Sequence, residues 1–244
     1  MENDSLVSFA ERLRDVCDNH GDCNGPERCE QIRNQAQHAL TVAAEFGLLR
    51  KPDFSWSEFR DSSEGANIGT EHMVELDTTS GLVGKTTIPP AFGVIPEVQR
   101  ISVAVANPDS EVVREREAIE FVNATPLEYL SRWIASNDIF GDNVRLVSVI
   151  RWSDGMVSFG ITQPQYHGVP AETREIEAFF NDAGWSRLKD PSGHMIFFNY
   201  AFAIMAIDAE KRNCYINKGG LQPFDVILCR PSEKMNSFLE IYPE

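Results

Sequence analysis

The sequence has no apolar run near the length of about 20 residues that a membrane-spanning helix needs. Its first residues, MENDSLVSFAERLRD, are polar and acidic, so we expect neither a signal peptide nor a membrane anchor. Basic residues are also scarce: 22 Lys and Arg stand against 37 Asp and Glu, and the formal net charge is −15. An acidic protein repels a phosphate backbone. We therefore expect a cytoplasmic protein that binds neither nucleic acid nor membranes.

Paired C-x2-C motifs are absent, although the chain has five cysteines. An odd number of cysteines without an export signal favours reduced thiols over disulfides. Thiolate and imidazole are the ligands that zinc prefers, and four such residues lie close together in sequence: Cys17, His20, Cys23 and Cys29. Their spacing, C-x2-H-x2-C-x5-C, lacks the paired knuckles of a zinc site. We expect free thiols, with a zinc site as the alternative.

The first fifty residues predict a helical hairpin. Apolar residues recur at helical spacing over residues 5–18. Pro26 suits the first turn of a second helix, which runs to about Leu49. Such hairpins usually only pack, and nothing in this one demands chemistry.

From Trp56 onward the pattern changes to short strands and turns. Residues 72–77 and 81–87 predict a β-hairpin across the turn T-T-S-G, and 101–107 predict another strand. Residues 88–97 contain three prolines and are expected to be irregular, because proline removes a ladder donor. Thr125 as N-cap, Pro126 at N1 and Glu128 at N3 predict a helix to about residue 140.

The rest of the chain alternates strands with one helix. We expect strands at 144–152 and 156–164, an amphipathic helix from 172 to 184, buried strands within 194–208, and strands at 214–217 and 221–229 around the turn N-K-G-G. This order predicts an α+β protein. Its expected segments are 1–50, 51–162 and 163–244.

Three polar residues near the end of the chain have the spacing of a kinase catalytic loop. Asp208 and Asn213 are five positions apart, as in H-R-D-L-x-x-x-N, and Asp225 follows across a hairpin. Phosphoryl transfer in kinases uses one Asp for the acceptor hydroxyl, an Asn for magnesium, and a second Asp for magnesium beside the phosphates. Ordinary turn and N-cap chemistry is the alternative explanation.

Upstream residues fit the same reading. Lys85 ends a strand that follows a hairpin, as does the phosphate-binding Lys of V-A-I-K. Gly65 and Gly69 offer a possible phosphate-covering loop, although their spacing is not G-x-G-x-x-G. For Lys85 the alternative is an ordinary solvated charge.

Four blocks together carry a family resemblance: T-P-L-E-Y-L-x-R-W-I-A-S-N-D-I-F-G-D-N-V-R-L, I-T-Q-P-Q-Y-H-G, D-A-x-x-x-N and F-D-V. Over about residues 60–231 the chain resembles the kinase-like domain of large polyvalent proteins of phages and mobile elements, within the protein-kinase-like superfamily. The resemblance implies a protein-kinase-like core, with a small antiparallel sheet as N-lobe and a truncated C-lobe of β-hairpins. It also implies ATP and Mg²⁺ as cofactors.

The resemblance assigns a role to each matching residue. Lys85 would contact the α- and β-phosphates, and Glu128 would orient Lys85 unless it serves only the capping box. Asp208 would be the catalytic base, and Asn213 and Asp225 the magnesium ligands. Backbone groups of the hinge would meet adenine around Gln163, Gln165 and Tyr166.

The chain also departs from the family. Ala206 and Ile207 replace the His and Arg before the catalytic Asp, Glu210-Lys211-Arg212 replaces a small segment, and Asp225-Val226-Ile227 replaces D-F-G. Residues 226–244 leave no room for a substrate-docking lobe, so we do not expect ordinary protein kinase activity. Two hypotheses remain. One is a compact phosphotransferase for an unknown acceptor; the other is a pseudokinase-type module that binds a protein partner, with the N-terminal helices as one possible contact.

Overall fold

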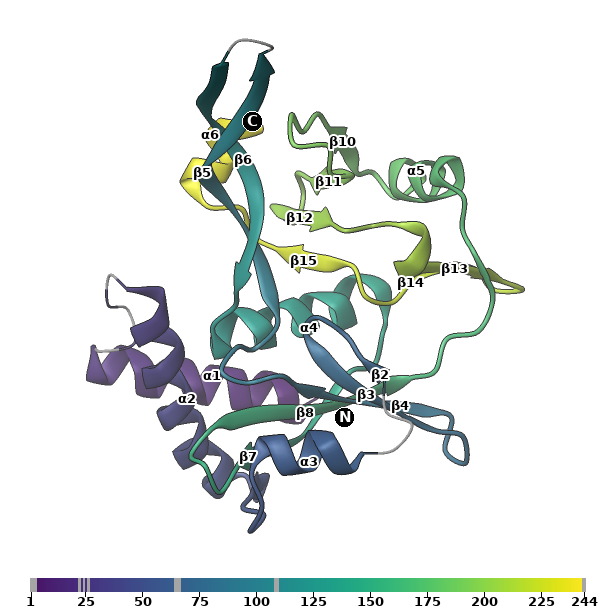
Figure 1. Cartoon of the computed structure of the whole chain (residues 1–244). Helices are drawn as coiled ribbons and strands as arrows, with labels where there is room; N and C mark the ends of the chain where they lie inside the picture. Colours follow the sequence, from purple (N-terminus) through teal and green to yellow (C-terminus); the bar gives the residue numbers. More distant parts are fainter. Residues whose placement is uncertain are drawn as a thin grey trace. The chain divides into compact units, whose positions relative to one another are not determined.

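The structure is a computed structural model that describes residues 4–21, 23, 25, 27–63, 67–107 and 110–242. The chain forms two compact units, Met1–Val94 with Asn123–Tyr166, and Ile95–Val122 with His167–Glu244. Helices and strands occur in both units, which confirms the predicted α+β class (Figure 1). The described helices are α1 (Asp4–His20), α2 (Arg28–Glu45), α3 (Trp56–Ser62) and α4 (Pro126–Phe140) in the first unit, and α5 (Thr173–Asp182) and α6 (Glu233–Phe238) in the second.

The first unit is built on a six-stranded sheet of order β1-β7-β8-β4-β3-β2. All neighbours are antiparallel except β1 and β7, so the sheet is mixed. Its strands are β1 (Leu49–Arg50), β2 (Asn67–Ile68), β3 (His72–Asp77), β4 (Leu82–Thr87), β7 (Arg145–Arg151) and β8 (Val157–Pro164). The two predicted hairpins, β3–β4 and β7–β8, are both confirmed.

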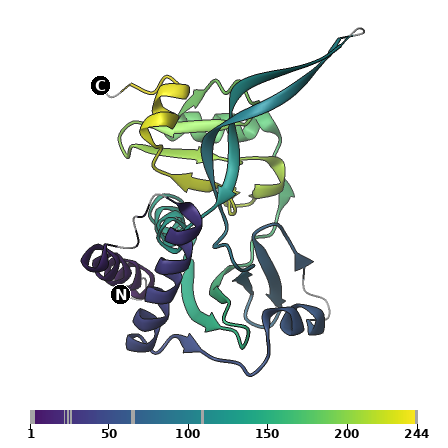
Figure 2. The ribbon, with the colours of Figure 1, turned by 60° about the vertical axis from the view of Figure 1, so that its left-hand side comes forward.

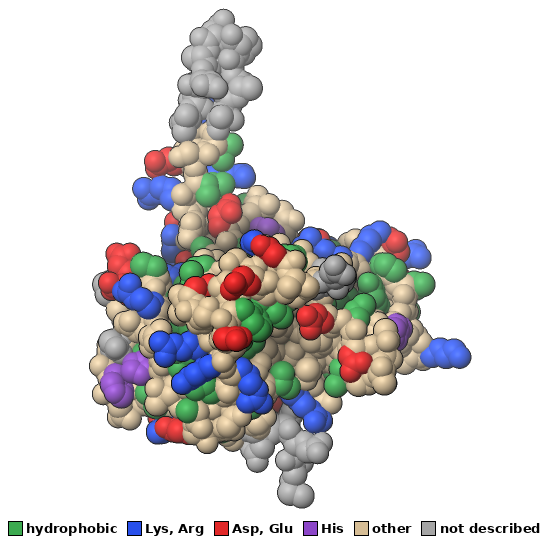
Figure 3. Space-filling view, turned by 60° about the horizontal axis from the view of Figure 1, so that its bottom comes forward, with side chains coloured by type: hydrophobic (Ala, Val, Ile, Leu, Met, Phe, Trp, Pro, Cys, Tyr) green, Lys and Arg blue, Asp and Glu red, His purple; other side chains and the backbone are tan. Residues whose placement is uncertain are grey.

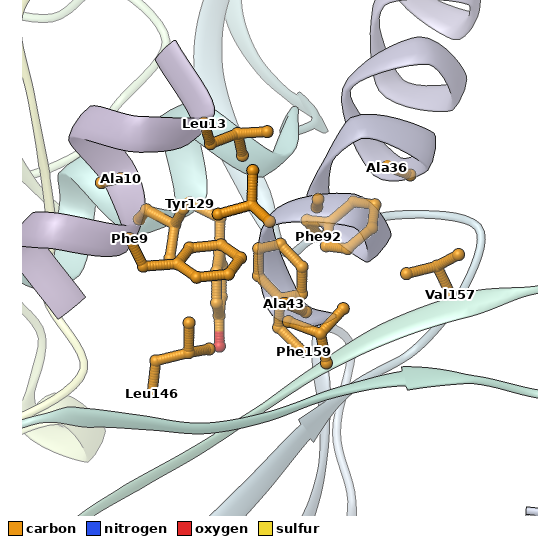
Figure 4. Close-up of a cluster of buried hydrophobic side chains, with 14 of the residues drawn as sticks. Phe9, Ala10, Leu13, Ala36, Ala43, Phe92, Tyr129, Leu146, Val157 and Phe159 are labelled. Atoms are coloured by element: carbon orange, nitrogen blue, oxygen red, sulfur yellow. The ribbon is translucent and has the colours of Figure 1, made fainter. Parts of the chain in front are cut away.

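Helices α1, α2 and α4 share one hydrophobic core with a face of this sheet. Phe159 of β8 is fully buried, and its ring centroid lies 4.7 Å from Phe92 and 6.1 Å from both Phe9 and Tyr129. Figure 4 shows these rings gathered around Phe159. The helical hairpin, predicted as a separate N-terminal segment, therefore packs as part of the first unit, because its apolar stripe is buried against the sheet.

The ends of two helices follow from local sequence. Helix α4 begins as predicted: Thr125 caps it, and Glu128 returns the second bond of the capping box. Helix α2 ends at Glu45, earlier than predicted, because Gly47 takes a positive φ of 69° and turns the chain into β1. Pro26, expected in the first turn of α2, lies outside the described residues.

A long two-stranded ribbon connects β4 to α4 in the sequence. Its strands are β5 (Val94–Asn107) and β6 (Ser110–Asn123), and they twist about one another (Figure 2). The prediction of irregular structure through residue 97 was wrong, since β5 includes Pro96. In a two-stranded ribbon each strand keeps an open edge, where a proline costs no ladder bond. Charged side chains of both signs lie along the ribbon's stem (Figure 3), and Arg100 pairs with Glu115 at 3.6 Å.

The second unit contains two further antiparallel sheets. One has the order β10-β11-β12-β15 and the other β14-β13-β9. The strands are β9 (Val169–Pro170), β10 (Ser186–Leu188), β11 (Ile196–Asn199), β12 (Ile204–Ile207), β13 (Cys214–Asn217), β14 (Gly220–Pro223) and β15 (Ile227–Cys229). Helix α5 packs on the four-stranded sheet through Phe180, whose ring stacks on the ring of Phe197 with the centroids 4.3 Å apart. The predicted hairpin around Asn217 is confirmed as β13–β14.

The structure bears on the cysteines and on membrane-spanning helices. No disulfide joins the five cysteines, all of which lie among the described residues. Within the described residues, no helix combines the length and the apolar character that a membrane crossing requires.

We expect Phe159→Ala to lower the free energy of unfolding by about 3–5 kcal/mol, because it opens a cavity in the core of the first unit. Urea titration followed by tryptophan fluorescence measures the change. Phe202→Ala is the matched control: Phe202 is 58% exposed, and its removal should cost less than about 1 kcal/mol. Equal losses in the two variants would contradict the assignment of Phe159 to the core.

Candidate functional site

The loop that follows β12 holds Asp208 in an unusual backbone conformation. Asp208 has a φ of 63°, in the left-handed region that Asp and Asn tolerate better than most residues. The loop is closed by two backbone bonds, from Glu210 N–H to the Asp208 carbonyl at 2.9 Å and from Asn213 N–H to the Glu210 carbonyl at 2.8 Å. The chain thus leaves a buried strand and turns sharply at the predicted catalytic Asp.

Asn213 holds this turn in place. Its side-chain Nδ2 donates to the Asp208 backbone carbonyl at 2.8 Å and to Oδ2 of the Asp208 carboxylate at 2.9 Å. The side chain is almost fully buried, with 7% of the residue exposed. Because Nδ2 makes both of these bonds, the amide oxygen is the atom that would face a cation. Two of the predicted residues are therefore in direct contact.

Asp225 reaches the same end of the sheet by strand pairing. Strands β12 and β15 are antiparallel neighbours, and Ile207 pairs with Ile227 (Figure 1). Asp208 directly follows Ile207, and Asp225 precedes Ile227 by two residues. Phe224 N–H also donates to the Asn213 carbonyl at 3.0 Å, which ties the chain before Asp225 to the loop. The three predicted residues of the second unit thus gather at one end of β12 and β15.

Arg212 is a member of this cluster that the sequence reasoning treated only as a departure from the family. Its Nη2 lies 2.6 Å from Oδ1 of Asp208 and its guanidinium lies 3.7 Å from Glu210. The pKa of Arg212 is raised, first by its hydrogen bond to Asp208 and then by the negative charge of Asp208. The charge of Asp225 makes a smaller contribution. Asp208 and Arg212 carry opposite charges only four positions apart in the sequence, and this proximity could have indicated the contact.

The donor set of this cluster fits magnesium in chemical type. Two carboxylates and an amide oxygen are hard oxygen ligands, which magnesium prefers. Among the described residues, no three His, Cys, Asp or Glu side chains form a group that could hold a metal ion. The four residues of the zinc alternative are all described, and they form no such group. Cys17 and Cys23 are buried, Cys29 is exposed, and the distance between His20 Nδ1 and the Val16 carbonyl oxygen is 2.8 Å.

Lys85 belongs to the first unit and is buried, with 5% exposed. On β4 it shares the buried face with Val83 and Thr87, on the helix-covered side of the sheet. Its Nζ lies 5.1 Å from the centroid of the Trp133 ring, a cation–π contact. The alternative of a solvated surface charge is therefore wrong. Lys85 follows Val83 by two residues and so lies on the same face of the strand, which was the signal for its inward direction.

Glu128 has a capping role in α4. Its Oε2 accepts the Thr125 N–H at 2.7 Å and an Arg28 Nη1 at 2.8 Å. The side chain of α4 that contacts Lys85 through its ring is Trp133. Arg132 contacts the same ring, with its guanidinium carbon 4.9 Å from the centroid, and pairs with Glu71 at 2.6 Å. The surroundings of Lys85 thus include an aromatic ring and a buried ion pair.

The residues predicted near adenine lie at the end of β8 and just beyond it. Gln163 is 3% exposed, and its buried Oε1 has no hydrogen-bond partner within the described structure. Gln165 N–H donates to the Gly81 carbonyl at 2.9 Å. Tyr166 Oη donates to Oδ1 of Asp142 at 2.9 Å, and burial together with the Asp142 charge raises the pKa of Tyr166. Gln163 is the residue of this group with an uncommitted polar atom.

The predicted phosphate-covering glycines are only partly described. Gly65 lies outside the described residues. Gly69 N–H donates to the His72 carbonyl at 2.8 Å, where it closes the turn between β2 and β3. In this structure Gly69 therefore serves the hairpin.

Comparisons of the chain with protein-family models, with curated proteins and with solved structures found no match.

The thiol of Cys214, which directly follows the loop, has a raised pKa. Cys214 is fully buried beside the loop, and burial, with a smaller effect of the Asp208 charge, raises its pKa from 9.0 to about 12. Between these values the unfolded chain has lost the thiol proton while the folded chain keeps it. The contribution of Cys214 to stability is thus complete below pH 9 and falls as the pH rises, by up to about 1.4 kcal/mol per pH unit.

We therefore expect wild type to lose more stability than Cys214→Ala between pH 8.5 and 10.5, by about 1–2 kcal/mol. Urea titrations at the two pH values give the difference. Cys29→Ala, at an exposed cysteine, should behave like wild type. Parallel pH profiles for wild type and Cys214→Ala would show that the buried thiol titrates normally.

Proposed function

We propose that the chain is a compact, atypical kinase-like phosphotransferase that binds ATP with magnesium. The observation that carries the proposal is the cluster at the end of β12 and β15. There Asn213 bonds Asp208, and strand pairing brings Asp225 to the same end. A strand, an Asp loop closed by an Asn, a hairpin and a second Asp occur in the order that kinase phosphoryl transfer uses.

Each residue of the cluster has a distinct task in this proposal. Asp208 orients the acceptor hydroxyl and accepts its proton, and the Asn213 bonds hold the carboxylate in one orientation. The amide oxygen of Asn213 and the carboxylate of Asp225 would hold magnesium. When bound, the ion would neutralise charge on the nucleotide phosphates. Without a cation, the two carboxylates would repel a polyphosphate.

The place of Lys85 supports the same function. Lys85 lies on β4, the third strand of the meander β2–β3–β4, and helix α4 follows later in the same unit. Kinases carry their phosphate-binding lysine on the third strand, before a helix whose Glu orients it. Here α4 presents Trp133 to Lys85, while Glu128 caps the helix. Lys85 is thus assigned to the phosphates, and no orienting role is assigned to Glu128.

A second candidate function is a pseudokinase-type module that binds a protein partner without catalysis. The Arg212 ion pair favours it, because a guanidinium 2.6 Å from Asp208 already neutralises the carboxylate that the first function needs. A partner at the N-terminal helices would meet polar side chains, since the apolar faces of α1 and α2 are buried in the core. The formal charge of −15 would steer a basic partner.

Thermal shift with ATP and magnesium tests nucleotide binding. We expect wild type to gain about 5–10 °C at a ligand concentration near 100 Kd, because the ligand stabilises only the folded state. Asp225→Ala should lose the magnesium-dependent part of this shift, and Lys85→Met should weaken it. Asp182→Ala, at an exposed acid of α5, is the matched control and should keep the full shift.

No shift in wild type would eliminate nucleotide binding, and an unchanged shift in Asp225→Ala would remove Asp225 from the metal site. Release of labelled phosphate from [γ-³²P]ATP then separates the two functions. Slow release that Asp208→Asn abolishes supports the phosphotransferase. Binding without release in wild type supports the non-catalytic module.

A further inference from the structure

The second unit has a pocket at the end of its four-stranded sheet opposite to Asp208. The cavity has a volume of about 730 Å³, within the usual size for small-molecule sites. Its walls include Phe198, Tyr200, Arg230, Asn236, Ile241 and Tyr242. These residues come from the end of β11, the residue after β15, and the chain from α6 to the last described residues.

Strand pairing separates this pocket from the acidic cluster. Ala203, also in the pocket wall, directly precedes β12, and Asp208 directly follows that strand. Five residue steps at about 3.3 Å each place their Cα atoms roughly 16 Å apart. Arg230 and Asp225 likewise lie at opposite ends of β15. The pocket is therefore distinct from the cluster proposed to hold magnesium.

Two polar groups of the pocket are uncommitted. The side-chain Oδ1 of Asn236 is buried and has no hydrogen-bond partner within the described structure. The backbone of Asn236 is fixed, since its N–H donates to the Ser232 carbonyl and its carbonyl accepts from Ile241 N–H, both at 2.8 Å. A buried carbonyl without a donor is costly, so a ligand N–H in this position would be favourable. The Arg230 side chain is exposed and forms no ion pair with the described residues.

The remaining walls are aromatic and apolar. Tyr200 is 43% exposed and Tyr242 is 70% exposed, so two large rings line one cavity while still open to solvent. Phe198 is buried and supports Tyr200 edge-on, with centroids 4.8 Å apart. Such rings form stacking surfaces for a flat ligand. Among the described lining residues there is no Asp or Glu, so nothing would neutralise a positive group. A zwitterionic amino acid therefore fits poorly.

We propose that this pocket binds a nucleoside monophosphate whose base carries an exocyclic amino group, such as AMP. The base lies against Tyr200 and Tyr242, its amine donates to Oδ1 of Asn236, and the phosphate binds Arg230. An amide oxygen that accepts from an adenine N6 amine is a known recognition pair. A single guanidinium suits a single phosphate group, which it can contact through two N–H donors. This second nucleotide site does not depend on the proposed phosphotransferase activity.

Calorimetric titration of the full chain with AMP in EDTA tests the site, because EDTA removes the magnesium-dependent contribution of the other cluster. We expect Arg230→Gln and Asn236→Leu each to weaken AMP binding at least about tenfold, the usual cost of losing a strong hydrogen bond to a ligand. Arg174→Gln is the matched control, since it removes one exposed positive charge elsewhere in the same unit. It should bind AMP as wild type does.

Ligand analogues test each contact without changing the protein. Inosine monophosphate replaces the amine by a carbonyl, adenosine lacks the phosphate, and ribose 5-phosphate lacks the base. Each should bind more weakly than AMP, and Arg230→Gln should no longer distinguish adenosine from AMP. Equal binding of AMP and inosine monophosphate, or wild-type affinity in Arg230→Gln, would overturn the proposal. Loss of AMP binding in Asp225→Ala but not in Arg230→Gln would place the nucleotide at the acidic cluster instead.

Discussion

The antiparallel pairing of β12 with β15 is the constraint on which both candidate sites of the second unit depend. Three residue pairs define it: Met205 with Cys229, Ala206 with Leu228, and Ile207 with Ile227. Because the strands are so short, the loops at their ends are placed almost directly by the register. A slip of one residue would turn buried side chains to the other face of the sheet. Both faces of the pairing are buried, with Met205 and Ile207 on one face and Leu228 on the other, so a slip would misplace all three side chains. Their packing therefore also fixes where Asp208 and Asp225 lie.

The two candidate functions of the acidic cluster differ in which cation accompanies Asp208. In the structure the cation is Arg212, which belongs to the same short loop. A metal ion at Asn213 and Asp225 would add positive charge beside that guanidinium and would weaken its ion pair with Asp208 by repulsion. Arg212 is 67% exposed and can move into solvent at little cost, whereas Asn213 is buried and fixed. Displacement of Arg212 would therefore leave the Asp208 carboxylate open to an acceptor hydroxyl without unfolding the loop.

Features that depend on neighbours in sequence were predictable, and features that depend on distant contacts were not. The capping box at Thr125 and the turn at Asn217 follow from local chemistry, and both are present. The five-residue spacing of Asp208 and Asn213 likewise indicated a contact that the structure contains. By contrast, the strand that contains Pro96 could not be predicted locally, because proline is tolerated there only since β5 pairs with a single strand and keeps one open edge. The contact of Lys85 with Trp133 joins a strand to a helix 48 positions later, and local pattern does not specify such a pair.

Because both candidate sites depend on the register of β12 and β15, only substitutions outside these strands can test one site alone. A change inside β12 or β15 would alter the register, and with it both ends of the sheet, so its effect could not be assigned to one site. Arg212 and Arg230 are exposed and lie outside the strands, at the acidic end and at the pocket end respectively. Each can be replaced without removing a buried contact of the pairing. Separate responses to these two changes would show that one small sheet supports two independent sites.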